Sequence, residues 1–181
     1  MIRLLRIMVD TFCSYGFATL HTSKRPETAA LILHNEVLPF YVERKIAVGA
    51  VLTDNRWPGG HRSDLRSRRG QQAAKGREFC GTDTHPFELY LALNDIEHRK
   101  TRVRRPQTNG FVERFHRTVL DEFFRVSMRD TVFDRLDDLQ ARLDAWLVHY
   151  NHERPHRGYR NMGRRPVAAI NQASTAVGHD G

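Results

Sequence analysis

The chain has 181 residues, 40% of them hydrophobic, and a formal net charge of +8 at pH 7. This length fits one domain with a substantial core, and the hydrophobic content excludes a chain that is disordered throughout. No apolar run approaches the roughly 20 residues that cross a bilayer, so no membrane partner is expected. The positive charge favours a polyanionic partner, although residues 56–75 alone hold a net charge of +5.

Two strands are predicted near the N-terminus, over residues 2–9 and 15–21, on either side of a short turn. Residues 1–9 are apolar with two arginines, but Asp10 ends the run and no small-residue cleavage site follows. A strand is therefore expected rather than a signal peptide. The two cysteines are isolated and lack metal-ligand spacing, which indicates a reducing, cytoplasmic setting.

A helix is predicted to begin at Pro26, and Pro39 is expected to kink it or to end its first part. The apolar face of this helix comprises Ala30, Leu31, His34, Val37, Leu38 and Tyr41. Residues 46–53 then form a nearly continuous apolar run, which is typical of a strand buried on both faces. A helix followed by such a strand suggests a βαβ crossover.

Residues 56–75 interrupt this pattern. Gly, Arg, Ser and Gln dominate the segment, and its only large apolar residues are Trp57 and Leu65, so it predicts a mobile loop. A short helix over residues 85–94 and a strand or extended segment over residues 96–103 are expected to follow.

A further helix is predicted to begin near residue 110, with Thr108 or Asn109 as its N-cap. Its apolar face consists of Val112, Phe115, Val119 and Phe123. The adjoining face carries Glu113, His116 and Arg117, because residues three and four apart are neighbours on a helix. Apolar spacing predicts a last helix over residues 136–150. We expect one domain over residues 1–170 and a disordered tail over residues 171–181.

Two acidic residues have the positions that metal-dependent phosphoryl transfer requires. Asp54 follows the apolar strand, and Glu113 lies in the first turns of a helix. Carboxylates are ligands that Mg²⁺ prefers, and two such ions can activate an attacking oxygen and stabilise a leaving oxygen. Each acid also has a simpler interpretation. An Asp–Asn pair after a strand is usually a turn, and a Glu near a helix start usually complements the helix dipole.

The chain resembles the catalytic core of insertion-sequence transposases of the retroviral-integrase superfamily over residues 2–170. The matching blocks occur in order at residues 52–55, 76–81, 94–98, 106–110, 113–115, 139–146, 150–158 and 163–166. They include Pro-Gln-Thr-Asn-Gly at 106–110 and Tyr-Asn-His-Glu-Arg-Pro-His at 150–156. The resemblance implies an α/β fold of the RNase H-like type, with a mixed sheet flanked by helices. It also implies that Asp54 and Glu113 are the second and third acids of an Asp-Asp-Glu site for Mg²⁺ or Mn²⁺.

The chain departs from this family in two ways. In the family, Thr-Asp-Asn continues directly into Gly-x-Glu-Phe, whereas here a 20-residue insertion, residues 56–75, separates the two motifs. The family's first strand, which carries the first acid, and its upstream helix-turn-helix segment are both missing from the match. Asp10 to Ser14 resemble an Asp-x-x-Ser turn that follows a later strand, with one more residue between the Asp and the Ser. Asp10 as the first acid is the alternative interpretation.

By this resemblance the chain is a core for metal-dependent cleavage and transfer of DNA strands, in integration and transposition, and the missing acid implies an inactive polypeptide. The alternative is a catalytically dead remnant that binds only DNA or a partner, such as a second copy or a full-length transposase. A general RNase H-like nuclease is a third interpretation, which the blocks at 106–110 and 150–156 disfavour. The run from residue 99 to 105 also suits a solvated basic surface. The expected DNA contacts are Arg99, Lys100, Arg102, Arg104, Arg105, Asn109, His116 and Arg117.

Overall fold

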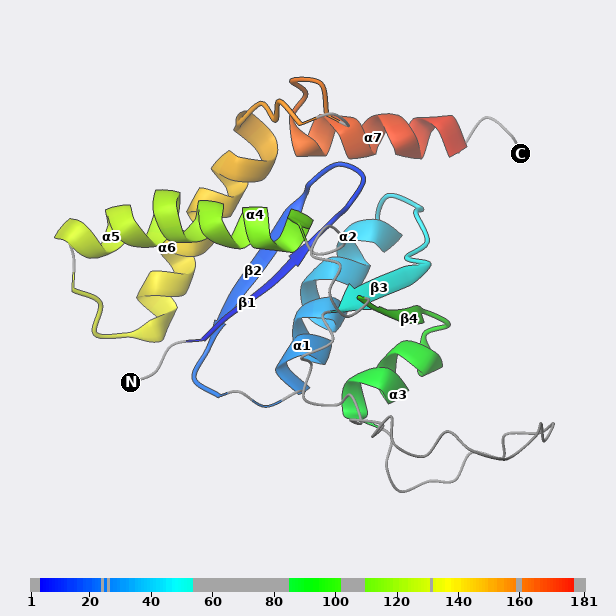
Figure 1. Cartoon of the computed structure of the whole chain (residues 1–181), viewed down its shortest axis with the longest axis horizontal. Coiled ribbons are helices and arrows are strands. Elements are labelled where there is room, and N and C mark those ends of the chain that lie inside the picture. Colours follow the sequence, from blue (N-terminus) through cyan, green and yellow to red (C-terminus); the bar gives the residue numbers. More distant parts are fainter. Residues whose placement is uncertain are drawn as a thin grey trace, which may run out of the picture.

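The computed structural model of the chain describes residues 4–23, 25, 27–53, 85–101, 110–130, 132–158 and 161–177. The strands of this part form two two-stranded sheets with helices packed around them (Figure 1). β1 (Leu4–Val9) pairs antiparallel with β2 (Gly16–His21). β3 (Ala50–Thr53) pairs in parallel with β4 (Glu97–Lys100). Both strand orientations expected for a mixed sheet are therefore present.

The described helices include the four that the sequence predicts and a further one near the C-terminus that it does not. In chain order they are α1 (Glu27–Ile32), α2 (Leu38–Val42), α3 (Pro86–Leu93), α4 (Gly110–Thr118), α5 (Arg125–Asp130), α6 (Leu136–Val148) and α7 (Pro166–Val177). π-Helical segments join α1 to α2 (Leu33–Val37) and α4 to α5 (Val119–Phe124), and another extends α6 (His149–Glu153). No described helix is both long enough and apolar enough to cross a membrane.

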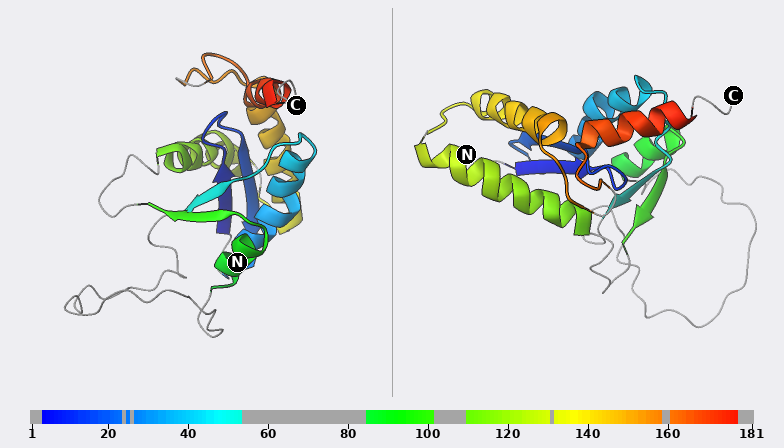
Figure 2. Two further views of the ribbon diagram at one scale, coloured as in Figure 1. Left: turned by 90° about the vertical axis from the view of Figure 1, so that its right-hand side faces the viewer. Right: turned by 90° about the horizontal axis from the view of Figure 1, so that it is seen from above.

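Both faces of the β1–β2 hairpin carry apolar side chains, and each face contacts a different hydrophobic cluster. On one face, Leu5, Ile7 and Val9 pack against a cluster that includes buried side chains of α4 and α6. On the other face, Met8 packs against a cluster built from α1, α3 and α7. This alternation follows from the period of two along a strand. The hairpin is therefore the central layer of the molecule, and Figure 2 shows α4 on one side of it and α1 with α2 on the other.

Side-chain amides cover the outer edge of β2. Gln140 accepts a hydrogen bond from the Leu20 amide at 2.7 Å, and Asn151 accepts one from the Gly16 amide at 2.8 Å. The Asn151 amide nitrogen also donates to the Gly16 carbonyl at 2.8 Å. Because these two side chains satisfy backbone groups of an edge strand, they fix α6 and its π-helical extension against the hairpin.

We predict that Asn151→Ala lowers the free energy of unfolding by about 2–4 kcal/mol, because both backbone groups of Gly16 would lose their buried partner. Asn151 is only 3% exposed, so water has little access to replace the lost hydrogen bonds. Urea unfolding followed by circular dichroism measures the effect. Asn35→Ala, on the exposed face of the π-helical segment before α2, is the matched control and is expected to change little. Equal stability of the two variants would contradict the role given to Asn151.

The helix predicted from Pro26 is present, but part of its predicted apolar face is wrong. Leu31 is 50% exposed and His34 is exposed, whereas Ile32 and Leu33 are buried in the core. The π-helical segment at this point has more residues per turn than an α-helix. Residues that would share one face at the α-helical spacing therefore do not share it here. The chain also continues in α2 past Pro39, and the π-helical segment immediately before it provides the change of helical geometry that the proline was expected to cause.

The strand predicted over residues 46–53 is shorter and more exposed than expected. Only Ala50–Thr53 is a strand, and Leu52 is 40% exposed. Ile46 and Val48 pack against the core without strand pairing, which accounts for their apolar character. The parallel crossover in the described chain joins β3 to β4 through α3, so the predicted crossover through the preceding helix is wrong.

The predicted tail begins too early, because α7 continues from Pro166 to Val177. Ala169 and Ile170 are buried in the cluster that contacts α1 and α3, and Ser174 donates a hydrogen bond to the Arg44 carbonyl at 2.6 Å. These contacts hold the helix over the turn between β1 and β2 (Figure 1). The insertion predicted at 56–75 lies outside the described residues.

Candidate functional site

Glu113 lies in the first turn of α4, on the exposed face of that helix. The opposite face anchors α4, since Phe115 is 1% exposed and Val119 is fully buried. His116 and Arg117 are exposed beside Glu113, as the helical spacing predicts. Among the described residues the Glu113 carboxylate has no hydrogen-bond or ion-pair partner, so its oxygens are free to bind a cation.

In Figure 1 and in the right-hand view of Figure 2, the carboxyl end of β3 lies on the side of the molecule where α4 begins. Thr53 is the last described residue of this strand, and Asp54 follows it directly in the sequence. Asp54 itself lies outside the described residues, as do Arg102, Arg104, Arg105 and Asn109. The predicted pairing of Asp54 with Glu113 therefore stays a prediction.

A hydrogen-bond network holds the end of β3 against β4 and α3. The Thr53 hydroxyl lies 2.8 Å from Nε2 of His98, and Nδ1 of His98 lies 3.3 Å from Glu88. The Lys100 ammonium lies 2.7 Å from the same Glu88 carboxylate. Burial lowers the pKa of His98, so the ring is neutral at pH 7 and bridges Glu88 and Thr53. Burial alone would raise the pKa of Glu88, but Lys100 and His98 lower it, so the carboxylate stays ionised.

The carboxylate of Asp10 is occupied by the turn between β1 and β2. Its Oδ1 accepts hydrogen bonds from the amides of Phe12 at 2.6 Å and Cys13 at 2.8 Å. Its Oδ2 accepts one from the Tyr41 hydroxyl. This geometry is that of an Asx turn, and it matches the interpretation of Asp10 as a turn residue. In the described part of the chain, no group of three or more His, Cys, Asp or Glu side chains is arranged to hold a metal ion.

The predicted DNA-contacting residues of β4 have acidic partners. Arg99 forms an ion pair with Glu97 at 2.5 Å, and Lys100 pairs with Glu88. The Arg99 side chain is 61% exposed, so solvent screens its pair and the guanidinium can exchange partners. His116 and Arg117 lie on the exposed face of α4, away from β4 in the sequence but on the element that carries Glu113.

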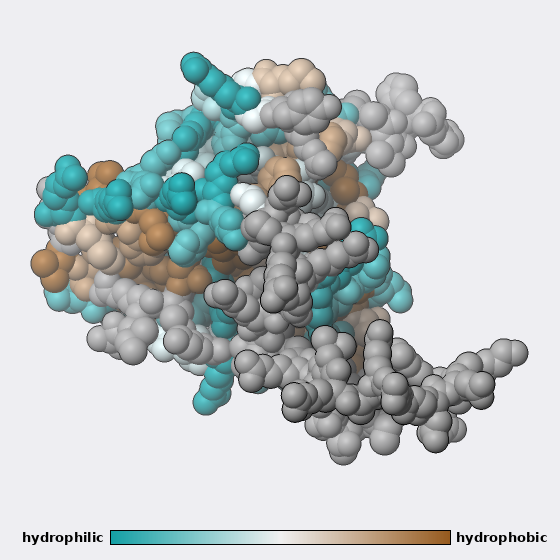
Figure 3. Space-filling model, viewed as in Figure 1, coloured by the Kyte–Doolittle hydropathy of each residue, from teal (hydrophilic) through white to brown (hydrophobic). Residues whose placement is uncertain are grey.

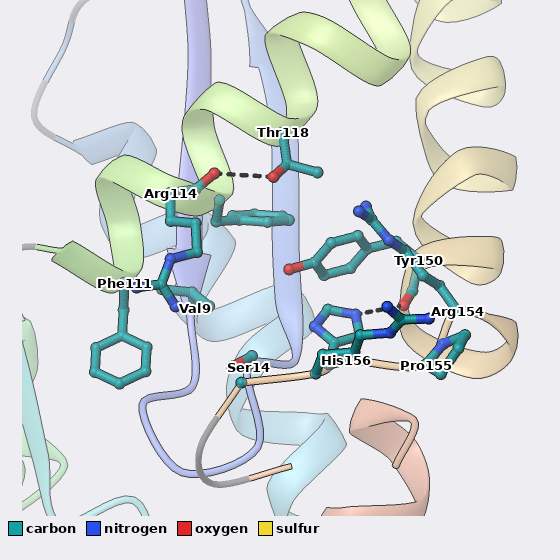
Figure 4. A pocket seen from close by; sticks show the side chains of 12 residues that line it. Val9, Ser14, Phe111, Arg114, Thr118, Tyr150, Arg154, Pro155 and His156 are labelled. Atoms are coloured by element: carbon teal, nitrogen blue, oxygen red, sulfur yellow. Dashed lines mark hydrogen bonds between the residues drawn. The ribbon is translucent and has the colours of Figure 1, made fainter. Parts of the chain in front are cut away.

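A basic pocket beside α4 was missed at the sequence level. It has a volume of about 350 Å³ and lies between α4, the end of β1 and the segment that follows α6. Figure 4 shows Arg114 and the hydroxyl of Tyr150 directed into this space, with His156 on the opposite wall. Arg154 and Arg157 also line it. The signal was available in the block at 150–157, where one tyrosine is followed closely by two arginines and two histidines.

Comparisons with known proteins agree with this architecture. The family model "Integrase core domain" matches residues 94–163, which include α4 and most of the pocket. A protein of Spiroplasma virus SpV1-C74 named "Putative integrase ORF3" is 36% identical over 72 residues, which are 39% of this chain and 18% of that protein. The alignment thus spans about a fifth of the length of that relative.

Solved structures share the fold over nearly the whole chain. The catalytic core domain of BIV integrase superposes with a TM-score of 0.58 at 19% identity, covering 98% of this chain and 90% of that one. A chain of the simian T-cell lymphotropic virus intasome, solved in complex with PP2A regulatory subunit B56 gamma, gives a TM-score of 0.56 at 17% identity. That match covers 91% of this chain and 47% of the intasome chain. Residues 94–163 are thus similar to integrase core domains, and the fold of the chain is that of retroviral integrase catalytic cores.

Proposed function

We propose that the chain is the catalytic core of an enzyme that cuts and joins DNA strands during integration or transposition. The observation that carries the proposal is the position of Glu113, an exposed carboxylate without a described partner in the first turn of α4. It lies within the segment that matches the integrase core model. The carboxyl end of β3, which leads into Asp54, lies on the side of the molecule where this helix begins (Figure 1).

Asp54 and Glu113 would hold a divalent ion, Mg²⁺ or Mn²⁺. The free Glu113 carboxylate fits a hard cation, which prefers carboxylate oxygens. The Asp10 carboxylate does not fit, because three hydrogen bonds already use it. When bound, the ion would stabilise charge on the attacking and leaving oxygens of the phosphodiester. His116 and Arg117, on the same exposed face as Glu113, would contact the DNA backbone.

We propose that this polypeptide has little or no strand-transfer activity. The site implied by the family resemblance has three acids. Only Asp54 and Glu113 of this chain are candidates for it, because three hydrogen bonds already use the Asp10 carboxylate.

A catalytically dead module that binds DNA or a partner is the second candidate. It is favoured by apolar side chains exposed on and beside α5, where Val126, Met128 and Val132 are 56%, 51% and 89% exposed. Figure 3 shows apolar surface at this end of the molecule, next to the hydrophilic outer side of α4. Such a surface suits a second copy or a full-length transposase.

DNA binding tests the proposed function. We expect the chain to bind unrelated duplexes of equal length with similar, weak affinity that falls as salt rises. Lys and Arg contacts to phosphate release counterions, so log K should fall against log salt with a slope of about −0.9 per contact. Fluorescence anisotropy at several salt concentrations measures this. Absence of binding, indifference to salt or strong preference for one sequence would contradict the expectation.

A further inference from the structure

We propose that the pocket between α4 and the segment after α6 binds a phosphodiester group of a DNA strand, through Arg114, Arg157 and the hydroxyl of Tyr150. The choice of DNA as the ligand rests on the proposed function. The site itself is inferred from the residues that line the pocket. None of these three residues belongs to the candidate metal site or to the DNA contacts predicted from sequence.

The pocket is a built cavity whose walls come from separate parts of the chain. α4 supplies Arg114 and Phe115, and the segment after α6 supplies the 154–158 wall. Asn161 ties this segment to the β1–β2 turn by donating a hydrogen bond to the Cys13 carbonyl at 2.6 Å. The volume of about 350 Å³ accommodates a phosphate with part of its sugar, and it is at the small end of ligand pockets.

Tyr150 presents a hydrogen-bond donor to the pocket from a fixed ring. Its ring is enclosed by Phe115, Trp146 and His156, with centroid separations of 5.0, 5.3 and 4.6 Å. The residue is 5% exposed, and its hydroxyl points into the cavity (Figure 4). In the described part of the chain the hydroxyl has no hydrogen-bond partner, and its oxygen is accessible from the cavity rather than buried. A ligand oxygen would supply the acceptor.

Burial raises the pKa of Tyr150 to about 12, although the nearby arginines 154 and 114 lower it. The hydroxyl therefore keeps its proton at neutral pH and acts as a donor. This property suits an acceptor-rich anion and does not suit a cation. A phosphodiester offers two unesterified oxygens and no proton to donate, so the pocket and this ligand are complementary.

The charge of the pocket also favours an anion. Arg154 is paired with Glu122 at 2.5 Å, which fixes one wall of the pocket and cancels that charge. Arg114 and Arg157 have no carboxylate partner among the described residues, so the pocket keeps two positive charges. The guanidinium fork matches phosphate oxygens in a bidentate geometry. These two side chains therefore provide the charge, and Tyr150 provides a directional hydrogen bond.

A DNA strand suits the site better than a free anion because of its place on α4. Arg114 follows Glu113 directly, so a backbone phosphate held in the pocket lies next to the helix turn that presents the candidate metal-binding carboxylate. Phosphate contacts fix the register and orientation of a nucleic acid without reading its sequence. The pocket would thus position a strand for chemistry at Glu113.

Anisotropy titrations of a labelled duplex with single variants test the site. Arg114→Ala and Arg157→Ala should each weaken binding by about tenfold, as expected for one charge-assisted hydrogen bond. Each should also make the salt slope shallower by about 0.9. Tyr150→Phe should weaken binding by about three- to tenfold and leave the slope unchanged, because it removes a neutral donor. Arg129→Ala, on α5, is the matched control and should match the parent chain. Thermal melts verify that each variant is folded.

A second experiment distinguishes binding of a DNA strand from binding of free phosphate. It also distinguishes a failure of this site from a failure of the proposed function. Inorganic phosphate and a short single strand are titrated while the NMR signals of Tyr150 and the arginine side chains are followed. DNA affinity that is unchanged in all three pocket variants, or lowered equally by Arg129→Ala, overturns the site. If the chain binds no DNA but phosphate shifts these signals in the parent and not in the variants, the anion site stands, and the DNA ligand and the proposed function fail.

Discussion

Replacing Phe115 by alanine is expected to lower the free energy of unfolding by about 3–5 kcal/mol. Phe115 is 1% exposed and joins α4 to the β1–β2 hairpin and to the Tyr150 ring, so its removal leaves a cavity where three elements meet. Urea unfolding followed by circular dichroism measures the change. Phe12, which is 54% exposed, is the matched control, and Phe12→Ala should cost far less.

Gly16 provides a stricter test of the same contact. A Cβ at this position would lie 2.3 Å from the Phe115 ring, so Gly16→Ala forces the ring to move. We expect Gly16→Ala to destabilise the parent chain by about 1–3 kcal/mol, the usual cost of overpacking. The same substitution in the Phe115→Ala background should cost much less. Additive effects of the two substitutions would show that the close approach of Gly16 and Phe115 is not the cause.

Strand-transfer activity is expected to be at background for the polypeptide as given, with either Mg²⁺ or Mn²⁺. A protein extended by an N-terminal strand with an aspartate, and lacking residues 56–75, should join DNA ends in a metal-dependent reaction, because a third carboxylate is then available to position a second ion. In that protein, Glu113→Gln should lower the rate by more than about 100-fold, since losing partners one shell further from a metal already costs about 10- to 100-fold.

Three further proteins make this assay decisive. Glu43→Gln in the extended protein changes an exposed carboxylate at the end of α2 and should leave the rate unchanged. Asp10→Asn in the unextended chain should leave the activity at background, where it already is. If this chain is already active and Asp10→Asn abolishes that activity, Asp10 is the first acid and the proposal of an inactive polypeptide is wrong. The activity of an extended protein that keeps residues 56–75 shows whether that segment obstructs DNA.

The local elements were predictable because they depend on short-range patterns. The hairpin, the helix at 85–94 and the helix that carries Glu113 are present, since the periods of apolar residues report which face of a strand or helix is buried. The same pattern placed Glu113, His116 and Arg117 on the exposed face of α4, where the structure also has them. The fold class had a different source, because it was implied by the resemblance of ordered sequence blocks to transposase cores, and the fold shared with retroviral integrase cores confirms it.

Partner choice between distant segments was decided by the tertiary structure. The run at 46–53 contains an apolar stretch that the sequence could not divide into strand and core-packing loop, because both require apolar residues. The tail was expected to be disordered, but contacts made by Ala169, Ile170 and Ser174 stabilise α7. The residues that they contact lie far away in the sequence.

The sequence by itself determined most of the elements, because turn, strand and helix preferences are local, and its resemblance to transposase cores singled out Asp54 and Glu113 as candidate acids. Only the tertiary structure decided the environment of each charged group. It bound Asp10 into a turn and gave Arg99 and Lys100 acidic partners. It also placed Arg114 and Arg157, which have no carboxylate partner among the described residues, around the pocket that the hydroxyl of Tyr150 enters. The physical reason is that burial, pairing and pKa depend on which distant side chains meet, and one linear sequence does not state those distances.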